Sequence, residues 1–425
     1  MACLLFGDLE PEIRMKITNI RSMRLCGPLN HGQGGDTTET IGKIVVRIDT
    51  DSGMYGLGEA DDFMGVLDGI AYLKQYLIGR DPMEINPIVS EALYGSLPPH
   101  HAKAKHGLMA GDIRAIPSMS PTATPIGPIA WAVSGVEMAL CDLVGKALKT
   151  PVYNLLGGAF RDRVRVYLDR SSPADVGNLD AWRAMATAAA EQGFSHIKFD
   201  IDYVTADLTG DVWNRSLSSK QISRIVERLS AARNVVGLDI EISVDCHMHY
   251  TATDAIRLAN ELAPLRLMWL EDPCPITNPD SCASVREKSP IAICVGEMFI
   301  AEQFRLFIDQ KACDIIHPDV MFSGGLHETR KIADYADLHH LPMAMHGNGG
   351  SLATIAAAHV AAASRNFLGL EYHYVETPWI GQFVQRDIPL FENGYVGLTD
   401  APGLGVELNT KVCRKHLVPG ESILD

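Results

Sequence analysis

The sequence predicts an α/β protein with a (β/α)8-type (TIM-like) barrel and a smaller α+β capping domain before it. Eight short apolar runs, each followed by a helical segment, fill the later part of the chain. The last six begin roughly every 23 to 27 residues, close to the length of one βα unit. Strands that alternate with helices form parallel sheets, and eight such units close into a barrel.

The predicted barrel strands end in polar residues, which a closed barrel gathers at one rim. These strands are Val164–Asp169, His196–Asp200, Ile240–Asp245, Arg266–Glu271, Ile291–Glu297, Asp314–Asp319, Leu341–His346 and Phe367–Glu371. The longer gap after the second strand holds Asp202–Ser219, which we expect to be an additional loop.

The chain, at 425 residues, exceeds a typical single domain. We expect a capping domain at 1–128, a barrel at 129–390 and a tail at 391–425 that packs back on the capping domain. The segments predicted before the barrel strands are two strands at Met15–Arg21 and Lys43–Thr50, a helix at Ala71–Ile78, a linker at Met109–Pro128 and a long buried helix at Ile129–Lys149.

The composition limits the partners and the location. A net charge of −15 argues against a nucleic-acid partner, because phosphate binding needs Lys and Arg. Nine cysteines without a CxxC pair indicate reduced thiols and a cytoplasmic location. The N-terminus lacks a basic region followed by an apolar stretch, and no apolar run approaches about 18 residues, so we expect neither a secretory signal nor a membrane partner.

Three carboxylates end consecutive predicted strands. Asp245, Glu271 and Glu297 end the third, fourth and fifth strands, 26 residues apart each time. At one rim they would repel one another strongly unless a cation neutralised them, and Mg²⁺ suits a set of oxygen ligands. A single acid after a strand is more often the cap of the next helix, but three at equal spacing favour a metal site.

A carboxylate–imidazole pair is predicted at the next two strand ends. Asp319 ends the sixth strand and His346 ends the seventh. A carboxylate beside an imidazole fixes its tautomer and raises its basicity, which makes the pair a general base. A lone histidine is more often structural, but the adjacent acid and the predicted metal site favour the catalytic interpretation.

Four further residues have a functional and a structural interpretation. His247, just after the third strand, is expected on its inner side as an acid–base group or metal ligand, with a neutral partner as the alternative. Lys198 on the second strand adds positive charge near a substrate carboxylate, or is a surface lysine. Glu371 on the eighth strand hydrogen-bonds a developing enolate as a protonated acid, or caps a helix. His317 shares a strand face with the dyad carboxylate, and a structural role is favoured.

Together with these strand ends, three glycine-containing segments resemble the enolase superfamily, specifically its mandelate racemase subgroup. They are a GLGEA turn at Gly56–Ala60, LLGG at Leu155–Gly158 and PGLGVEL at Pro402–Leu408. The resemblance extends over essentially the whole chain, and enzymes of this superfamily combine a Lys or His base with Mg²⁺. The roles it implies are Mg²⁺ ligation by Asp245, Glu271 and Glu297, a base dyad of His346 with Asp319, and a contact of Glu371 with the substrate carboxylate.

Two short segments favour dehydration over racemisation. The racemase has Lys-x-Lys on the second strand, whose second Lys is a base on the opposite face, whereas this chain has KFD at Lys198–Asp200. A carboxylate does not simply replace that cationic lysine. The DCH segment at Asp245–His247 is similar to the Asp-x-His of galactonate dehydratases, in which the histidine protonates the departing hydroxyl.

The expected activity is Mg²⁺-dependent dehydration of a small sugar acid, an aldonate or aldarate, to a 2-keto-3-deoxy acid. A polar, Gly-rich loop around His31 and Gly34 is expected to close over the barrel mouth. A homo-oligomer is expected, as is common among relatives. Two alternatives remain: a racemase or epimerase of 2-hydroxy acids with Lys198 or Asp200 as its second base, and a non-catalytic metal-binding barrel.

Overall fold

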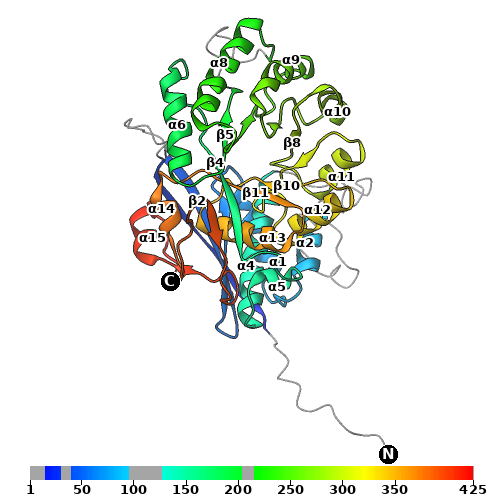
Figure 1. Ribbon diagram of the computed structural model, residues 1–425. Helices are drawn as coiled ribbons and strands as arrows, with labels where there is room; N and C mark the ends of the chain where they lie inside the picture. Colours follow the sequence, from blue (N-terminus) through cyan, green and yellow to red (C-terminus); the bar gives the residue numbers. More distant parts are fainter. Residues whose placement is uncertain (1–14, 30–39, 95–126, 203–214, 425) are drawn as a thin grey trace, which may run out of the picture.

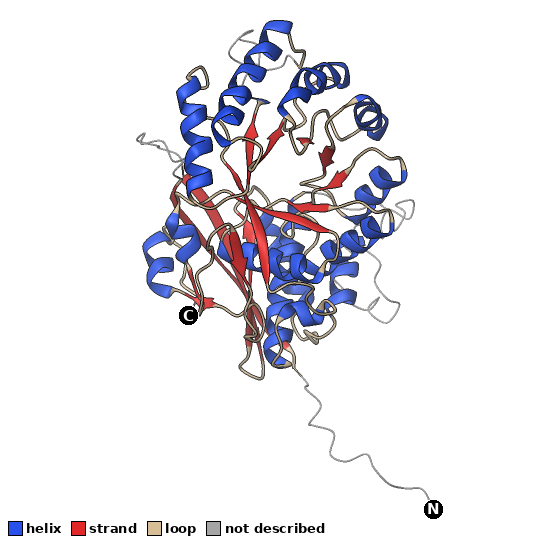
Figure 2. Ribbon diagram, in the orientation of Figure 1, coloured by secondary structure: helices blue, strands red, loops and turns tan. Residues whose placement is uncertain are grey.

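The structure is a computed structural model that describes residues 15–29, 40–94, 127–202 and 215–424. A capping unit built on the N-terminal strands lies below a barrel in the view of Figure 1. Figure 2 shows the barrel strands inside a ring of helices. The predicted barrel with an N-terminal capping domain is confirmed.

The capping sheet has three antiparallel strands in the order β1–β2–β3. The prediction of a turn at Gly56–Ala60 is wrong, because these residues lie inside the third strand. The two predicted strands are present, and the first continues further than expected. The strands are β1 (Ile17–Pro28), β2 (Thr40–Thr50) and β3 (Tyr55–Asp61).

The glycines of β3 permit close packing. A Cβ on Gly56 would lie 2.0 Å from the carbonyl oxygen of Ala139, and one on Gly58 would lie 2.1 Å from that of Gly135. Both carbonyls belong to α4 (Pro128–Ala147), so this helix lies directly on the strand. Only a residue without a Cβ allows a backbone to approach so closely.

Helix α4 is the predicted long, buried helix. It is long and apolar enough to cross a membrane, but 83% of its apolar window is buried inside the protein. Helices α1 (Val66–Leu77) and α2 (Ile85–Tyr94) pack on it. The helix predicted at Ala71–Ile78 is therefore found as the later part of α1.

In the described residues, eight parallel strands pair in sequence order, and β11 pairs with β4 to close the barrel. All eight overlap the predicted strands. They are β4 (Arg163–Asp169), β5 (His196–Asp200), β6 (Glu241–Asp245), β7 (Leu270–Glu271), β8 (Ile293–Val295), β9 (Ile315–Ile316), β10 (Met343–Met345) and β11 (Phe367–Tyr372).

Helices alternate with the strands along the chain and cover the outside of the barrel (Figure 1). Side-chain caps begin several of them, including the capping box of Ser218 and Gln221 at α8. The helices are α5 (Val152–Leu155), α6 (Leu179–Glu191), α8 (Ser219–Val236), α9 (Ala252–Leu262), η3 (Ala263–Leu265), α10 (Pro279–Lys288), α11 (Ala301–Asp309), α12 (Leu326–Leu338) and α13 (Ser351–Ala363).

The barrel interior below its rim is mainly apolar and includes a buried hydrogen bond between His196 and Ser243. Tyr167, Trp269, Cys294, Ile315 and Ala344 form a buried cluster from five strands. Side chains two residues apart on a strand share a face. The next inward-pointing residue of each strand therefore lies one layer closer to the C-terminal rim. That higher layer carries the charged residues of the site, on an apolar floor.

Two buried carboxylates from the capping side bond the first N–H groups of barrel helices. Glu59 of β3 accepts from the N–H of Gly350 and from that of Ala353, 3.0 Å away, at the start of α13. Glu137 of α4 accepts from the N–H of Leu326 at the start of α12, 2.7 Å away. Such bonds satisfy donors without intrahelical partners and place negative charge at the positive end of each helix.

The C-terminal segment returns to the capping sheet and lies beside its strands in Figure 1. Arg24 of β1 pairs with Glu421 at 2.8 Å, and its carbonyl accepts from the N–H of Val418 at 3.0 Å. The boundaries at 128 and 390 stay predictions, because α4 contacts both β3 and α12. The segment contains α14 (Pro378–Gln382), β12 (Val384–Gln385), β13 (Tyr395–Gly397), β14 (Glu407–Leu408) and α15 (Thr410–His416).

Three predicted segments lie mostly outside the described residues. They are the Gly-rich loop with His31 and Gly34, the linker at Met109–Pro128 and the additional loop at Asp202–Ser219. The lid function of the first stays a prediction.

We expect Gly58→Ala to lower the free energy of unfolding by about 2 kcal/mol or more, because the new Cβ would overlap the backbone of α4. Gly381→Ala is the matched control, since a Cβ there would meet its nearest atom at 3.6 Å. Chemical denaturation measures both. Equal stability of the two variants would contradict this role of Gly58.

Candidate active site

Asp245, Glu271 and Glu297 meet at the C-terminal rim of the barrel. Asp245 and Glu271 end β6 and β7 and are paired in register, while Glu297 follows β8. One carboxylate oxygen from each lies within 4.8 Å of the others, and all three side chains are buried. The structure thus brings together the three residues that spacing alone predicted as ligands.

This donor set fits a hard divalent cation. Mg²⁺ binds carboxylate oxygens and completes its octahedral shell with water and substrate oxygens. Three carboxylates buried this close repel one another, and a cation offsets that repulsion. Asp200, Asp245 and His247 form an adjoining group with ligand atoms at similar spacing. The identity of the ion as magnesium stays a prediction.

The backbone turns sharply at these strand ends. Ser171, His247 and Asp272 follow β4, β6 and β7 with φ angles of 52°, 42° and 34°. Gly296, with a φ of 114°, directly precedes Glu297. Positive φ is unfavourable for residues with a Cβ, and such conformations concentrate at functional sites. The rim therefore stores backbone strain where it directs the acidic side chains.

Lys198 lies among the carboxylates and is not a surface lysine. Its Nζ is 2.5 Å from Glu271 Oε1, 2.6 Å from Glu371 Oε1, 3.1 Å from Asp245 Oδ2 and 3.3 Å from Asp169 Oδ2. Burial lowers the pKa of Lys198, but these carboxylates outweigh burial and raise it well above its ordinary value. Lys198 is therefore a fixed positive charge inside the site.

His317 is a second buried cation beneath the metal-ligand cluster. Its Nδ1 is 2.9 Å from the carbonyl of Ala344, which can only accept, so Nδ1 carries a proton. Its Nε2 is 3.1 Å from Glu271 Oε1 and 3.4 Å from Glu371 Oε2. Burial lowers the pKa of His317, but Glu271 outweighs burial and raises it well above the ordinary value. The sequence favoured a structural role for His317. The structure adds an electrostatic role, because its charge lies beside Glu271 and Glu371.

Lys198 and His317 in turn lower the pKa of Glu271. Burial raises the pKa of this carboxyl, yet His317 and Lys198 outweigh burial and hold the pKa at about 2. The indole N–H of Trp269 donates to the other carboxylate oxygen at 2.8 Å. Glu271 is thus kept ionised and fixed in direction, which a metal ligand requires.

His346 and Asp319 form the predicted dyad. His346 Nδ1 is 2.6 Å from Asp319 Oδ2, and Nε2 is 3.4 Å from Glu297 Oε2 and 3.9 Å from Glu371 Oε2. Burial lowers the pKa of His346, but Glu371, Asp319 and Glu297 outweigh burial and raise it to about 9. A cation bound at Glu297 would lower this pKa toward the range of a general base.

Glu371 lies between the dyad and Lys198. Its Oε2 accepts from the hydroxyl of Tyr167 at 3.3 Å, and its Oε1 is 3.3 Å from His373 Nε2. Burial raises the pKa of Glu371, but Lys198, His346 and His373 outweigh burial and hold it well below its ordinary value. These contacts place the Glu371 carboxylate inside the barrel and not at a helix cap. Its role as a protonated acid toward the substrate stays a prediction.

His247 reaches the site by a different route from the expected one. Strand alternation does not place it, because β6 ends at Asp245 and His247 lies in a left-handed turn. Its Nε2 is still 3.6 Å from Asp245 Oδ2, and its Nδ1 is 3.3 Å from Asp202 Oδ2. Burial lowers the pKa of His247, but Asp245, Asp202 and Asp200 outweigh burial and raise it to about 12. These carboxylates therefore keep the half-exposed imidazole of His247 protonated, and a cation bound beside Asp245 would lower its pKa.

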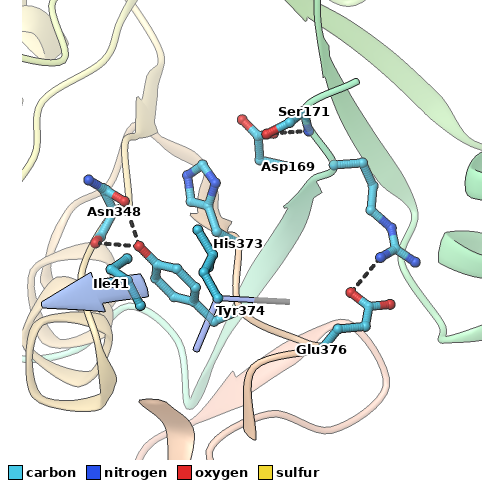
Figure 3. A pocket seen from close by; sticks show the side chains of 9 residues that line it. Ile41, Asp169, Ser171, Asn348, His373, Tyr374 and Glu376 are labelled. Atoms are coloured by element: carbon cyan, nitrogen blue, oxygen red, sulfur yellow. Dashed lines mark hydrogen bonds and ion pairs between the residues drawn. The ribbon is translucent and has the colours of Figure 1, made fainter. Parts of the chain in front are cut away.

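A cavity of about 190 Å³ opens beside these groups. Figure 3 shows His373, Tyr374 and Asn348 on one side and Asp169 on the other. Side chains with both donors and acceptors therefore line the space, which suits a ligand with several hydroxyl groups.

An ion pair is part of the cavity lining. Arg170 Nη1 bonds Glu376 Oε2 at 2.5 Å, and both residues line the space (Figure 3). Leu29 and Ile41 of the capping side complete the lining. The cavity thus lies between the barrel rim and the capping unit.

Sequence reasoning missed His373. It follows Glu371 by two residues at the end of β11, lines the cavity and lies 6.3 Å from the ring of His346 between centroids. A search for polar residues two positions beyond each strand end would have found it, as it found His247.

Family models describe both parts of the chain. The model for the "Mandelate racemase / muconate lactonizing enzyme, N-terminal domain" matches residues 21–157, and the "Enolase C-terminal domain-like" model matches residues 181–412. This chain belongs to the enolase superfamily. The resemblance stated from the sequence is confirmed, and the superfamily's barrel and capping domain are the parts seen here.

Relatives in the superfamily cover most of the chain. A D-xylonate dehydratase of Haloferax volcanii is 36% identical over 384 residues, which is 90% of this chain and 87% of that protein. A D-galactonate dehydratase of Verminephrobacter eiseniae is 30% identical over 378 residues, 86% of this chain and 88% of the relative. A solved mandelate racemase/muconate lactonizing enzyme-like protein of Rubrobacter xylanophilus is 31% identical, with a TM-score of 0.82 and coverage of 96% and 98%.

We expect a divalent cation to stabilise the fold, because it offsets the repulsion among the buried ligands. At about 100 times its Kd, Mg²⁺ would add about 2.7 kcal/mol to the free energy of unfolding. Calorimetry of chelator-treated protein, with increasing MgCl2, measures this as a rise in Tm. Glu297→Gln should remove most of the rise, whereas Glu302→Gln on α11 should keep it. A wild-type Tm that is insensitive to divalent cations would contradict the metal site.

Proposed function

We propose that this enolase-superfamily protein is a Mg²⁺-dependent sugar-acid dehydratase, which removes the proton next to a carboxylate and expels the 3-hydroxyl. One observation carries the proposal: His346, whose Nδ1 is held by Asp319, has its other ring nitrogen, Nε2, 3.4 Å from the carboxylate of Glu297. A base therefore lies beside the cluster that would chelate a substrate carboxylate.

The named relatives support this reaction class. They are dehydratases of D-xylonate and D-galactonate, and a D-mannonate dehydratase of Caulobacter vibrioides is 29% identical over 396 residues, 88% of this chain and 91% of that protein. Each name refers to a monocarboxylic sugar acid with several hydroxyls. The polar lining of the cavity fits such a molecule, so an aldonate is favoured over an aldarate.

Proton abstraction falls to the dyad. Asp245, Glu271 and Glu297 would hold Mg²⁺, which when bound supplies positive charge for the negative charge that develops on the substrate carboxylate. His346 takes the proton from carbon 2 at Nε2, while Asp319 holds its Nδ1–H and so fixes the ring and tautomer.

Elimination then needs an acid, and His247 is proposed for this role. It carries a proton at Nε2 or Nδ1 and donates it to the 3-hydroxyl as the bond from carbon 3 to oxygen breaks. The bonding electrons leave with oxygen, which departs as water. The enol becomes the 2-keto-3-deoxy acid, and the proton gained by His346 balances the one given by His247.

The alternative function, a racemase or epimerase on the same barrel scaffold, would require a second base. Lys198 is held as an ammonium by surrounding carboxylates. Burial, then the charge of Asp169, raises the pKa of Asp200 well above its ordinary value, and its carboxyl is buried against Asp245 and His247. Neither candidate supplies the base, which favours one-sided abstraction followed by elimination. A non-catalytic barrel has no need of the intact dyad.

The remaining expectations belong to the same proposal. We infer a cytoplasmic enzyme of carbohydrate catabolism that acts on a small molecule and assembles as a homo-oligomer. The cysteine pattern supports the location, and the sugar-acid dehydratase relatives support the substrate class and metabolic role.

We expect the wild-type protein with Mg²⁺ to form a 2-keto-3-deoxy acid from at least one member of a panel of mono- and diacid sugars. His346→Asn should lower kcat by on the order of 10²- to 10⁴-fold, because it removes the base while leaving the metal ligands. The 2-keto product and the metal affinity are both measured. Retained turnover in His346→Asn would remove this residue from the base role.

We expect His247→Asn to separate the two steps. Elimination should be lost, while solvent deuterium still enters carbon 2 of unreacted substrate, because His346 remains able to remove that proton. Proton NMR in D2O follows both. Simultaneous loss of exchange and elimination would leave the separate acid role unsupported.

A further inference from the structure

The turn after β10 connects the dyad to the capping unit. Asn348 lies two residues beyond His346, and its backbone N–H points to Asp319 Oδ2 at 3.5 Å. The same oxygen accepts from His346 Nδ1 at 2.6 Å. The N–H of Met321 donates to the other oxygen, Asp319 Oδ1, at 2.7 Å, so Asn348 contacts the side of the carboxylate that faces the base.

Two buried residues of the capping sheet bond Asn348 from the other side. Lys43 of β2 donates from Nζ to the carbonyl of Asn348 at 2.5 Å. Asp61 of β3 accepts from Asn348 Nδ2 at 3.1 Å. The two also bond each other, with Lys43 Nζ 2.5 Å from Asp61 Oδ1, so they act as one unit.

Tyr374 provides a third bond to the same residue. Its hydroxyl lies 2.6 Å from Asn348 Oδ1 and 3.0 Å from the Asn348 carbonyl (Figure 3). The backbone carbonyl and both side-chain heteroatoms of Asn348 are thus held from the capping sheet and from the segment after β11. A residue bonded at all of these atoms has little freedom to move.

The Lys43–Asp61 pair is costly as a purely structural element. Lys43 is 0% exposed and Asp61 is 4% exposed. Burying an ion pair gains little over apolar residues of the same size, so its value lies in the geometry it imposes. What it holds in this protein is the turn that leads away from His346.

We propose that Lys43 and Asp61 of the capping unit are positioning residues for proton abstraction: by fixing Asn348 they hold Asp319 and thereby aim His346 at carbon 2. This inference rests on the proposed function, since it assumes that the dyad is the base. Neither residue touches the reacting atoms. Their loss therefore misdirects the base without removing a catalytic group, and small misplacements of this kind cost up to about a hundredfold in rate.

If Lys43 and Asp61 only stabilised the fold, a variant that restores stability would also restore activity. A double variant that removes both charges therefore distinguishes a positioning role from a purely structural one. Lys43→Met or Asp61→Leu alone leaves an unpaired buried charge and should lower Tm. Lys43→Met combined with Asp61→Leu removes both charges and should recover much of that Tm. The bonds from positions 43 and 61 to Asn348 remain absent in the double variant, while those from Tyr374 are kept.

For the double variant we expect kcat to fall by about tenfold or more, with KM and Mg²⁺ affinity within about twofold of wild type. The primary isotope effect with substrate deuterated at carbon 2 should increase, because abstraction becomes slower. Asp142→Asn is the control: its carboxylate bonds the N–H of Leu57 and Leu404, both at 2.8 Å, so the variant should lose stability without losing kcat. A wild-type kcat in the stable double variant would overturn the proposal.

A crystal structure of the double variant provides a readout that does not depend on turnover. We expect Asn348 to shift and the His346 Nδ1 to Asp319 Oδ2 contact to lengthen or change partner. An unchanged dyad would overturn the positioning role even if the protein turned over no sugar acid. Failure of the wild-type protein on the whole substrate panel would instead overturn the proposed function.

Discussion

The site depends on positive charge among carboxylates that have lost their hydration. Asp245, Glu271 and Glu371 are buried together, and their repulsion would oppose folding without a counter-charge. Lys198 bonds all three and supplies part of it, and a cation that also binds Glu297 would supply more. Replacing buried charges by apolar residues often stabilises a protein, so this arrangement is explained by chemistry rather than by stability.

The barrel and its metal-ligand residues were predictable from the sequence because their signals are local. Strand and helix patterns repeat at one βα length, and closure of the sheet then brings Asp245, Glu271 and Glu297 to one rim. The third capping strand was not predictable in this way. Gly56–Ala60 has no β-branched residue, and its glycines resemble a turn. Glycine is needed at these positions because the backbone of α4, a helix far along the sequence, packs directly against them.

The finer parts of the site depend on turns and long-range contacts, which leave no periodic pattern. His247 was expected near Asp245 by strand alternation, yet a left-handed turn after the strand brings it there. The contacts of His317 with two carboxylates required the closed barrel. Lys43 meets Asn348 across 305 positions, so no local feature of β2 indicates that contact.

The capping unit is tied to the barrel at the segment that carries the base. Glu59 caps α13, the helix that follows His346. Lys43 bonds Asn348, which lies between His346 and α13. Separating the two units would break the hydrogen bonds from Glu59 to the start of α13 and from Lys43 to Asn348. These bonds therefore couple the position of the capping unit to the turn that follows the dyad histidine. Its strands β2 and β3 belong to the machinery that directs His346, and they do more than cover the barrel mouth.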